Sequence, residues 1–236
     1  MLKVMVIGAL GRMGRAVCGA VGAEDDMTLS AAVDPAFSDP KARDDFGIGG
    51  VPAYEGLEEC LEAEGADVAV DFTNPSTVFD HVMACLERGI HCVVGTTGLG
   101  EEQLEEIERK ARSAGANCFI APNFAIGAVL MMEAARMIVR HLPAAEIIEL
   151  HHDQKLDAPS GTALRTADLM AGERPEAEAP PGPEGNPARG MVHDGIPIHS
   201  VRLPGLIAHQ EVVFGGRGQS LSIRHDSITR DSFMPG

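Results

Sequence analysis

The chain has 236 residues, of which 44% are hydrophobic, so it is long and apolar enough for one large domain or two small ones. Its formal net charge of -16 argues against nucleic acid and anionic membranes as partners, because the mean field of the protein repels phosphate. No apolar run is long enough to span a bilayer. Any anionic ligand must therefore be held by local positive groups.

The five cysteines are odd in number and show neither a Cys-x-x-Cys pair nor the spacing of a zinc site. Such cysteines are typical of reduced, mostly buried thiols. The apolar run at the amino terminus leads into a glycine pattern and not into a cleavage site. We therefore expect a cytoplasmic protein without a structural metal.

Up to about residue 123, short β-branched runs alternate with segments of helical periodicity. This alternation predicts an α/β fold, with a Rossmann-type, doubly wound parallel sheet. Helices are expected from Asn74-Pro75-Ser76 to about Arg88 and over Glu101–Ser113. The predicted strands are Lys3–Gly8, Thr28–Asp34, Asp67–Phe72, His91–Gly95 and Asn117–Ala121.

The second half predicts an α+β domain with an open mixed sheet. A helix over Ala125–His141 is expected to face the core through Ile126, Val129, Leu130, Met137 and Ile138. A strand over Glu146–Leu150 and a helix over Ser160–Met170 follow, then a Pro- and Gly-rich loop over 174–190. Three alternating runs, Ile196–Leu203, Glu211–Phe214 and Ser220–Arg224, predict further strands, mainly antiparallel.

We expect residues 1–123 to bind a dinucleotide and residues 124–230 to bind substrate and form oligomer contacts. Residues 231–236 are expected to begin a return to the first domain that is cut short.

Gly8, Gly11 and Gly14 lie directly after an apolar strand and directly before a helix. Such a loop lets backbone N–H groups approach a pyrophosphate, and Arg12 can add positive charge. Glycines also mark turns without a ligand, but Asp34 ends the second strand, where an acid can bind an adenosine ribose hydroxyl. Because Asp34 would repel a ribose phosphate, we expect NADH to be preferred over NADPH.

Two further segments follow predicted strands at the edge where open α/β sheets bind ligands. They are Gly95-Thr96-Thr97-Gly98 and Ala121-Pro122-Asn123-Phe124. Each is either part of the dinucleotide site or a simple connection between a strand and a helix.

The stretch Glu149-Leu-His-His-Asp-Gln-Lys155 is dense in titratable groups and precedes Pro159-Ser-Gly-Thr162, which predicts a helix start. In an extended chain, His151, Asp153 and Lys155 share one side and His152 takes the other. Zinc binding by His151, His152 and Asp153 would need an irregular loop. A solvated polar loop is the other alternative.

The free N–H groups of that helix start, with Lys155 beside them, predict a site for a small carboxylate. A histidine nearby can supply a proton near neutral pH. Combined with a hydride carrier, these groups predict a reductase of a small carboxylate.

The motif E-L-H-H-D-Q-K-L-D-A-P-S-G-T-A, residues 149–163, resembles the signature of the 4-hydroxy-tetrahydrodipicolinate reductase family, also called dihydrodipicolinate reductase. V-I-G-A-L-G-R-M-G, V-D-F-T-N-P-S, G-T-T-G and A-P-N-F are similar to segments of that family, in the same order. The resemblance implies reduction of a cyclic dicarboxylate by NADH or NADPH in the diaminopimelate route of lysine biosynthesis. It also implies a homotetramer.

By this resemblance, His151 is the expected general acid, and Lys155 binds or polarises the substrate. His152, Gly161 and Thr162 are expected to contact the substrate carboxylates. The residues expected to line the dinucleotide are Gly8, Gly11, Arg12, Met13, Gly14, Asp34, Gly95, Thr96, Thr97, Ala121, Pro122, Asn123 and Phe124.

Three alternatives remain. Another two-domain dehydrogenase of amino acids or hydroxy acids would share the glycine loop but not the run from His151 to Thr162. A dinucleotide-binding sensor would need no acid beside an anion pocket. An inactive, truncated homologue would keep the motifs without turnover.

Overall fold

The computed structural model describes residues 1–175 and 186–236, and the chain divides into two compact units, Met1–Pro122 and Asn123–Gly236. Among the described residues, no helix combines the length and the apolar character needed to cross a membrane. All five cysteines are free thiols, and four of them are buried.

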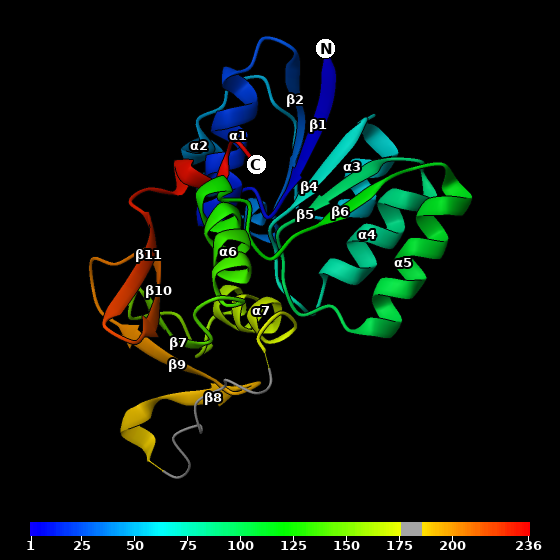
Figure 1. The fold of residues 1–236 in the computed structure, drawn as a ribbon. Helices are drawn as coiled ribbons and strands as arrows, with labels where there is room; N and C mark the ends of the chain where they lie inside the picture. Colours follow the sequence, from blue (N-terminus) through cyan, green and yellow to red (C-terminus); the bar gives the residue numbers. More distant parts are fainter. Residues whose placement is uncertain (176–185) are drawn as a thin grey trace. The chain divides into compact units, whose positions relative to one another are not determined.

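The first unit is built on a parallel six-stranded sheet with the strand order β3-β2-β1-β4-β5-β6 (Figure 1). The order reverses between β1 and β4, as in doubly wound folds, so the predicted fold class is confirmed. The strands are β1 (Leu2–Ile7), β2 (Met27–Val33), β3 (Ala53–Tyr54), β4 (Val68–Asp71), β5 (His91–Val94) and β6 (Cys118–Ile120). The helices are α1 (Arg12–Ala23), α2 (Pro40–Phe46), α3 (Leu57–Ala63), α4 (Val78–Glu87) and α5 (Glu101–Ala114).

The central strand β1 is buried on both faces, because helices cover both sides of the sheet. Met5 and Ile7 pack in one apolar cluster with side chains of α3, α4 and α5. Side chains alternate along a strand, so Val4 and Val6 face the opposite side, where α1 packs on β1 and β2. The sheet thus brings the carboxyl ends of its parallel strands to one edge.

The predicted start of the helix at Asn74-Pro75-Ser76 is wrong. Residues 75–77 form a turn, in which the Asn74 side chain accepts a hydrogen bond from the backbone N–H of Ser76 at 3.0 Å. The helix α4 starts at Val78. An Asn followed by Pro favours either a helix start or an Asn-capped turn, and here the turn places the chain along the sheet edge.

The second unit contains a mixed five-stranded sheet with the order β11-β10-β7-β9-β8. Strand β7 pairs in parallel with β9 and antiparallel with β10, and the remaining pairs are antiparallel. The predicted open mixed sheet is confirmed. The strands are β7 (Ala144–His151), β8 (Met191–His193), β9 (Ile196–Arg202), β10 (Ala208–Gly216) and β11 (Gln219–Ser227), and the helices are α6 (Ile126–Ile138) and α7 (Gly161–Ala171).

The predicted core face of α6 is wrong. Four of its five residues are exposed, at 51% for Ile126, 41% for Val129, 64% for Leu130 and 60% for Met137. The buried side chains of α6 are Ala128, Met131, Met132 and Ala135. This helix is apolar nearly all round, so periodicity cannot select a face, and the small alanines allow the closest packing.

Strand β7 ends at His151, and the chain then turns, with Lys155 N–H bonded to the carbonyl oxygen of His152 at 3.1 Å. The chain is therefore not extended beyond His151, and the alternation that an extended chain would produce does not apply to Asp153 and Lys155. Helix α7 begins at Gly161 behind an N-cap from Ser160, within one residue of the prediction. The loop expected over 174–190 lies largely outside the described residues.

We predict that Leu86→Ala, in a fully buried position of α4, lowers the free energy of unfolding by about 2 to 5 kcal/mol, because it leaves a cavity in the first core. Leu104→Ala on α5 is the matched control, since Leu104 is 40% exposed. It should cost less than about 1 kcal/mol. Urea denaturation followed by circular dichroism measures both; equal losses would contradict the packing described here.

Candidate active site

The glycine loop of the first unit needs its glycines because backbone segments meet there at short range. A Cβ on Gly14 would lie 2.0 Å from the carbonyl oxygen of Gly8, and one on Gly8 would lie 2.6 Å from that of Phe72. Gly8 also has φ +82, which favours glycine. No side chain caps the start of α1, so its first N–H groups can take an anion. The loop therefore fits a pyrophosphate.

Asp34 lies at the end of β2, beside this loop. Its carboxylate accepts hydrogen bonds from the backbone N–H groups of Leu10 and Ala36, both at 3.0 Å. It lines a cavity of about 450 Å³ together with Gly8, Gly11, Glu55 and His81. The predicted ribose acid and the predicted phosphate loop thus share one cavity.

A neighbouring cavity of about 380 Å³ is lined by residues of the glycine loop and of the segment Gly95-Thr96-Thr97-Gly98. Thr73 also lines this cavity, and its backbone N–H donates a hydrogen bond to Oγ1 of Thr96 at 2.8 Å. Ala121 and Pro122 follow β6 but line neither cavity, whereas Asn123 and Phe124 belong to the second unit. The predicted cofactor residues that line the 380 Å³ cavity are Gly11, Arg12, Met13, Gly95, Thr96 and Thr97.

Asp71 organises this edge of the sheet, although sequence reasoning did not single it out. Its side chain is 2% exposed and accepts hydrogen bonds from Thr73 Oγ1 at 2.7 Å and Thr96 Oγ1 at 3.0 Å. Its other oxygen lies 2.8 Å from His81 Nδ1. An acid at the carboxyl end of an apolar strand was a usable signal, but two of its partners come from the segment after β5 and from α4.

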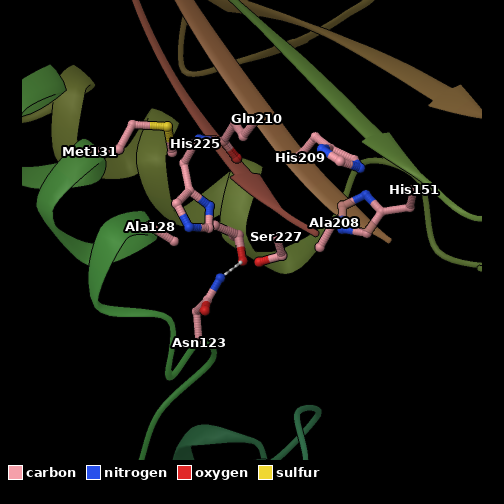
Figure 2. Close-up of a pocket in the computed structure, with 10 residues that line it drawn as sticks. Asn123, Ala128, Met131, His151, Ala208, His209, Gln210, His225 and Ser227 are labelled. Atoms are coloured by element: carbon pink, nitrogen blue, oxygen red, sulfur yellow. Dashed lines mark hydrogen bonds between the residues drawn. The ribbon is translucent and has the colours of Figure 1, made fainter. Parts of the chain in front are cut away.

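The second unit has a smaller pocket, which Figure 2 shows with His151 and His209 on its right and His225 and Met131 on its left. Its volume is about 20 Å³, far less than that of the two cavities in the first unit. Two of the predicted substrate residues, His151 and Thr162, line it. The amide nitrogen of Asn123 donates a hydrogen bond to Thr162 Oγ1 at 3.1 Å. Asn123, which we predicted for the dinucleotide, thus lies beside predicted substrate residues.

His151 is held by a carboxylate at the end of β7. Its Nδ1 lies 2.5 Å from Oε2 of Glu149, which is fully buried. Burial raises the pKa of Glu149, but hydrogen bonds from His151 and Arg202 outweigh it and bring the pKa down to about 2. The carboxylate is therefore ionised near neutral pH.

The remaining predicted substrate residues lie around the start of α7. Gly161 and Thr162 are its first two residues, and Ser160 caps it by accepting a bond from Ala163 N–H at 3.2 Å. Lys155 places its ammonium 2.7 Å from both oxygens of Asp157. Burial raises the pKa of Asp157, but the bond and charge of Lys155 produce a net lowering. His152 follows His151 and does not line the pocket.

The alternative zinc site of His151, His152 and Asp153 is not assembled in the described structure. Among the described residues, the side chains close enough to share a metal ion are Asp168, His193 and Asp194. His193 Nε2 lies 2.6 Å from Asp168, which is an ordinary surface ion pair.

Four polar pocket residues come from β10 and β11: His209, Gln210, His225 and Ser227. His209 accepts a bond from Ile207 N–H at 3.3 Å and donates through Nδ1 to Asp226 at 2.6 Å. Burial lowers the pKa of His225, which favours its neutral form. No local pattern marks these residues, because strand pairing alone brings them to β7.

A glycine loop followed by an acid at the end of the next strand in one unit, and a histidine held by a carboxylate in the other, are typical of a dinucleotide-dependent oxidoreductase. The family model described as "Dihydrodipicolinate reductase, N-terminus" matches residues 2–124, and its C-terminal counterpart matches residues 127–236. The chain belongs to the dihydrodipicolinate reductase family and is an NAD(P)H-dependent reductase. The predicted family is confirmed.

Individual relatives are similar over nearly the whole chain. The 4-hydroxy-tetrahydrodipicolinate reductase of Syntrophomonas wolfei is 48% identical, over 99% of this chain and 90% of the relative. That of Halalkalibacterium halodurans is 46% identical, over 100% and 91%. The dipicolinate-bound dihydrodipicolinate reductase of Paenisporosarcina sp. TG-14 has a TM-score of 0.83 and 44% identity, covering 100% of this chain and 91% of that one.

We predict that Gly14→Ala abolishes NADH binding at concentrations that saturate the wild type, because the new methyl group forces the loop away from Gly8. Gly19→Ala on the same helix is the control: its Cβ would meet nothing within 4 Å. It should bind NADH normally and be more stable by about 0.5 to 1 kcal/mol. NADH fluorescence titration distinguishes them, and normal binding by Gly14→Ala would contradict the assigned role of the loop.

Proposed function

We propose that the chain reduces 4-hydroxy-tetrahydrodipicolinate to tetrahydrodipicolinate in the diaminopimelate route of lysine biosynthesis. A hydride from NADH or NADPH and a proton are added, and the 4-hydroxyl group leaves as water. Family membership supports this reaction. The observation in the molecule that carries it is His151, which lines a pocket and is oriented by a buried carboxylate.

Recognition of a dicarboxylate is proposed at the start of α7. The N–H groups of Gly161 and Thr162 have no carbonyl partner within the helix, so they can bind one carboxylate. Lys155 would bind the other, and Asp157 would keep its ammonium in place. A dipicolinate-bound relative supports a dicarboxylate ligand.

His151 is the proposed general acid. Its Nδ1 is turned toward Glu149, so Nε2 is the atom left to deliver the proton. The bound dinucleotide would supply the hydride, and Gly8, Gly11 and the start of α1 would hold its pyrophosphate. An imidazole suits this role because its ordinary pKa is near neutral.

A preference for NADH is proposed from the charge of the cavity beside Asp34. Glu55 lines the same cavity, and no Lys or Arg is among its described lining residues. A ribose 2′-phosphate there would meet two carboxylates. Arg43, which follows Asp34 in the sequence and lies on α2, does not line the cavity and donates through its Nε to the carbonyl oxygen of Phe37 at 2.6 Å. The homotetramer and the domain boundaries expected from the sequence stay predictions.

We predict that His151→Ala lowers kcat by about 10²- to 10⁴-fold while NADH affinity is unchanged, because it removes the acid and not the cofactor site. The assay follows NADH oxidation, with substrate made in situ from pyruvate and aspartate semialdehyde by the preceding synthase. His199→Ala is the control, since His199 pairs with Glu146 on the sheet and does not line the pocket. Full activity of His151→Ala, or no turnover by the folded wild type, would overturn the proposal.

We predict that the wild type has a lower KM for NADH than for NADPH, and that Glu55→Gln lowers the KM for NADPH by roughly two- to fivefold. The reason is the loss of one exposed negative charge from the cavity. Glu59→Gln, an exposed acid on α3 outside the lining, should leave both constants unchanged. A wild-type preference for NADPH would show that the two acids do not set the selectivity.

A further inference from the structure

Glu149 stands out in the second unit because a glutamate side chain with 0% exposure is buried beside the proposed acid. Its Oε2 lies 2.5 Å from His151 Nδ1 and accepts a bond from Arg202 at 2.9 Å. Its Oε1 accepts from Arg202 at 2.7 Å and from Ser160 N–H at 3.3 Å. Both oxygens therefore have partners.

The burial of Glu149 leaves one consistent arrangement of protons. An ionised carboxylate accepts hydrogen bonds and donates none, so the hydrogen between it and His151 belongs to Nδ1. The neutral imidazole must then carry no hydrogen on Nε2. A proton taken up from solvent arrives at Nε2, and Nε2 is the nitrogen that can pass it on.

Arg202 makes this burial possible. Its guanidinium binds Glu149 through two nitrogens, and one of them also donates to the carbonyl oxygen of Asp157 at 2.7 Å. A buried carboxylate without such a partner would be neutralised or expelled. Arg202 also ties the loop that carries Lys155 to the strand that carries His151.

We infer that Glu149, supported by Arg202, is a positioning residue that fixes the tautomer and ring orientation of His151, so that its proton is delivered from Nε2. This inference rests on the proposed role of His151 as the acid. Glu149 itself does not line the pocket, so it acts through His151.

The same strand offers an internal comparison. Glu146 also pairs with a histidine, with His199 Nε2 at 2.8 Å, and with Arg189. Its side chain is 37% exposed, and neither it nor His199 lines the pocket. Each of two glutamates on β7 thus pairs with a histidine and an arginine. One of these groups is buried at the site, and the other lies near the surface. The surface group controls for a purely structural contribution.

The first test reads the tautomer directly in the full chain. Long-range ¹H–¹⁵N correlation spectra of ¹⁵N-histidine protein, assigned with His151→Ala, distinguish a hydrogen on Nδ1 from one on Nε2. We expect wild-type His151 to be the Nδ1–H form when neutral, and Glu149→Gln to shift it toward Nε2–H, since an amide can donate to Nδ1. A wild-type Nε2–H form would overturn the inference without any kinetic measurement, whether or not Glu149→Gln folds.

The second test is kinetic. Glu149→Gln should lower kcat by about 10- to 100-fold, with the KM for NADH unchanged. Glu149→Asp keeps the charge and should recover part of kcat, whereas Glu146→Gln should keep full kcat. Thermal melts check that each variant is folded.

The outcomes separate this inference from the proposed function. If the wild type turns over and Glu149→Gln keeps both kcat and the tautomer, the reductase assignment stands and the inference fails. An equal loss in Glu146→Gln would also overturn it, because the effect would then come from the stability of β7. If the wild type does not turn over, the proposed function fails, and the tautomer still decides the role of Glu149.

Discussion

A buried carboxyl group needs hydrogen bonds to replace its lost hydration, and this constraint organises the functional end of each unit. Asp71 in the first unit draws Thr73, Thr96 and His81 around one strand end. Glu149 in the second unit does the same with His151, Arg202 and Ser160. In both cases, one buried carboxyl group binds side chains or backbone groups from segments that are far apart in the sequence, and this joins those segments.

The two carboxylates produce different results because their partners differ. Asp71 accepts hydrogen bonds from two hydroxyl groups and a backbone N–H, which join the segments that follow β4 and β5. Glu149 is bound by a guanidinium that cancels its charge, which leaves its remaining hydrogen-bonding capacity to orient an imidazole. The first arrangement joins two loops at the edge of the sheet, and the second orients the histidine for which we propose a role in proton transfer.

The negative net charge of the protein is consistent with anion binding by local groups. A net charge of -16 gives no general attraction for an anionic dinucleotide or a dicarboxylate. We propose that binding depends on backbone N–H groups at α1 and α7, with Arg12 and Lys155 close by in the sequence. Asp34 and Glu55 place two further carboxylates in the cavity beside the glycine loop.

The sequence by itself determined the fold class, the family, and the positions of the glycine loop, Asp34, His151 and the start of α7. These features depend on local patterns: glycine spacing, β-branched runs and a capped helix start are readable from neighbouring residues. Only the tertiary structure decided the buried face of α6, the turn before α4, and the partners of His151. Strand alternation places Glu149 on the same face of β7 as His151, so the sequence could have predicted this partner. Arg202, His209 and His225 come from strands whose pairing depends on non-local packing. Which polar groups meet a buried charge depends on the sum of contacts across the whole domain, so no local pattern can specify it.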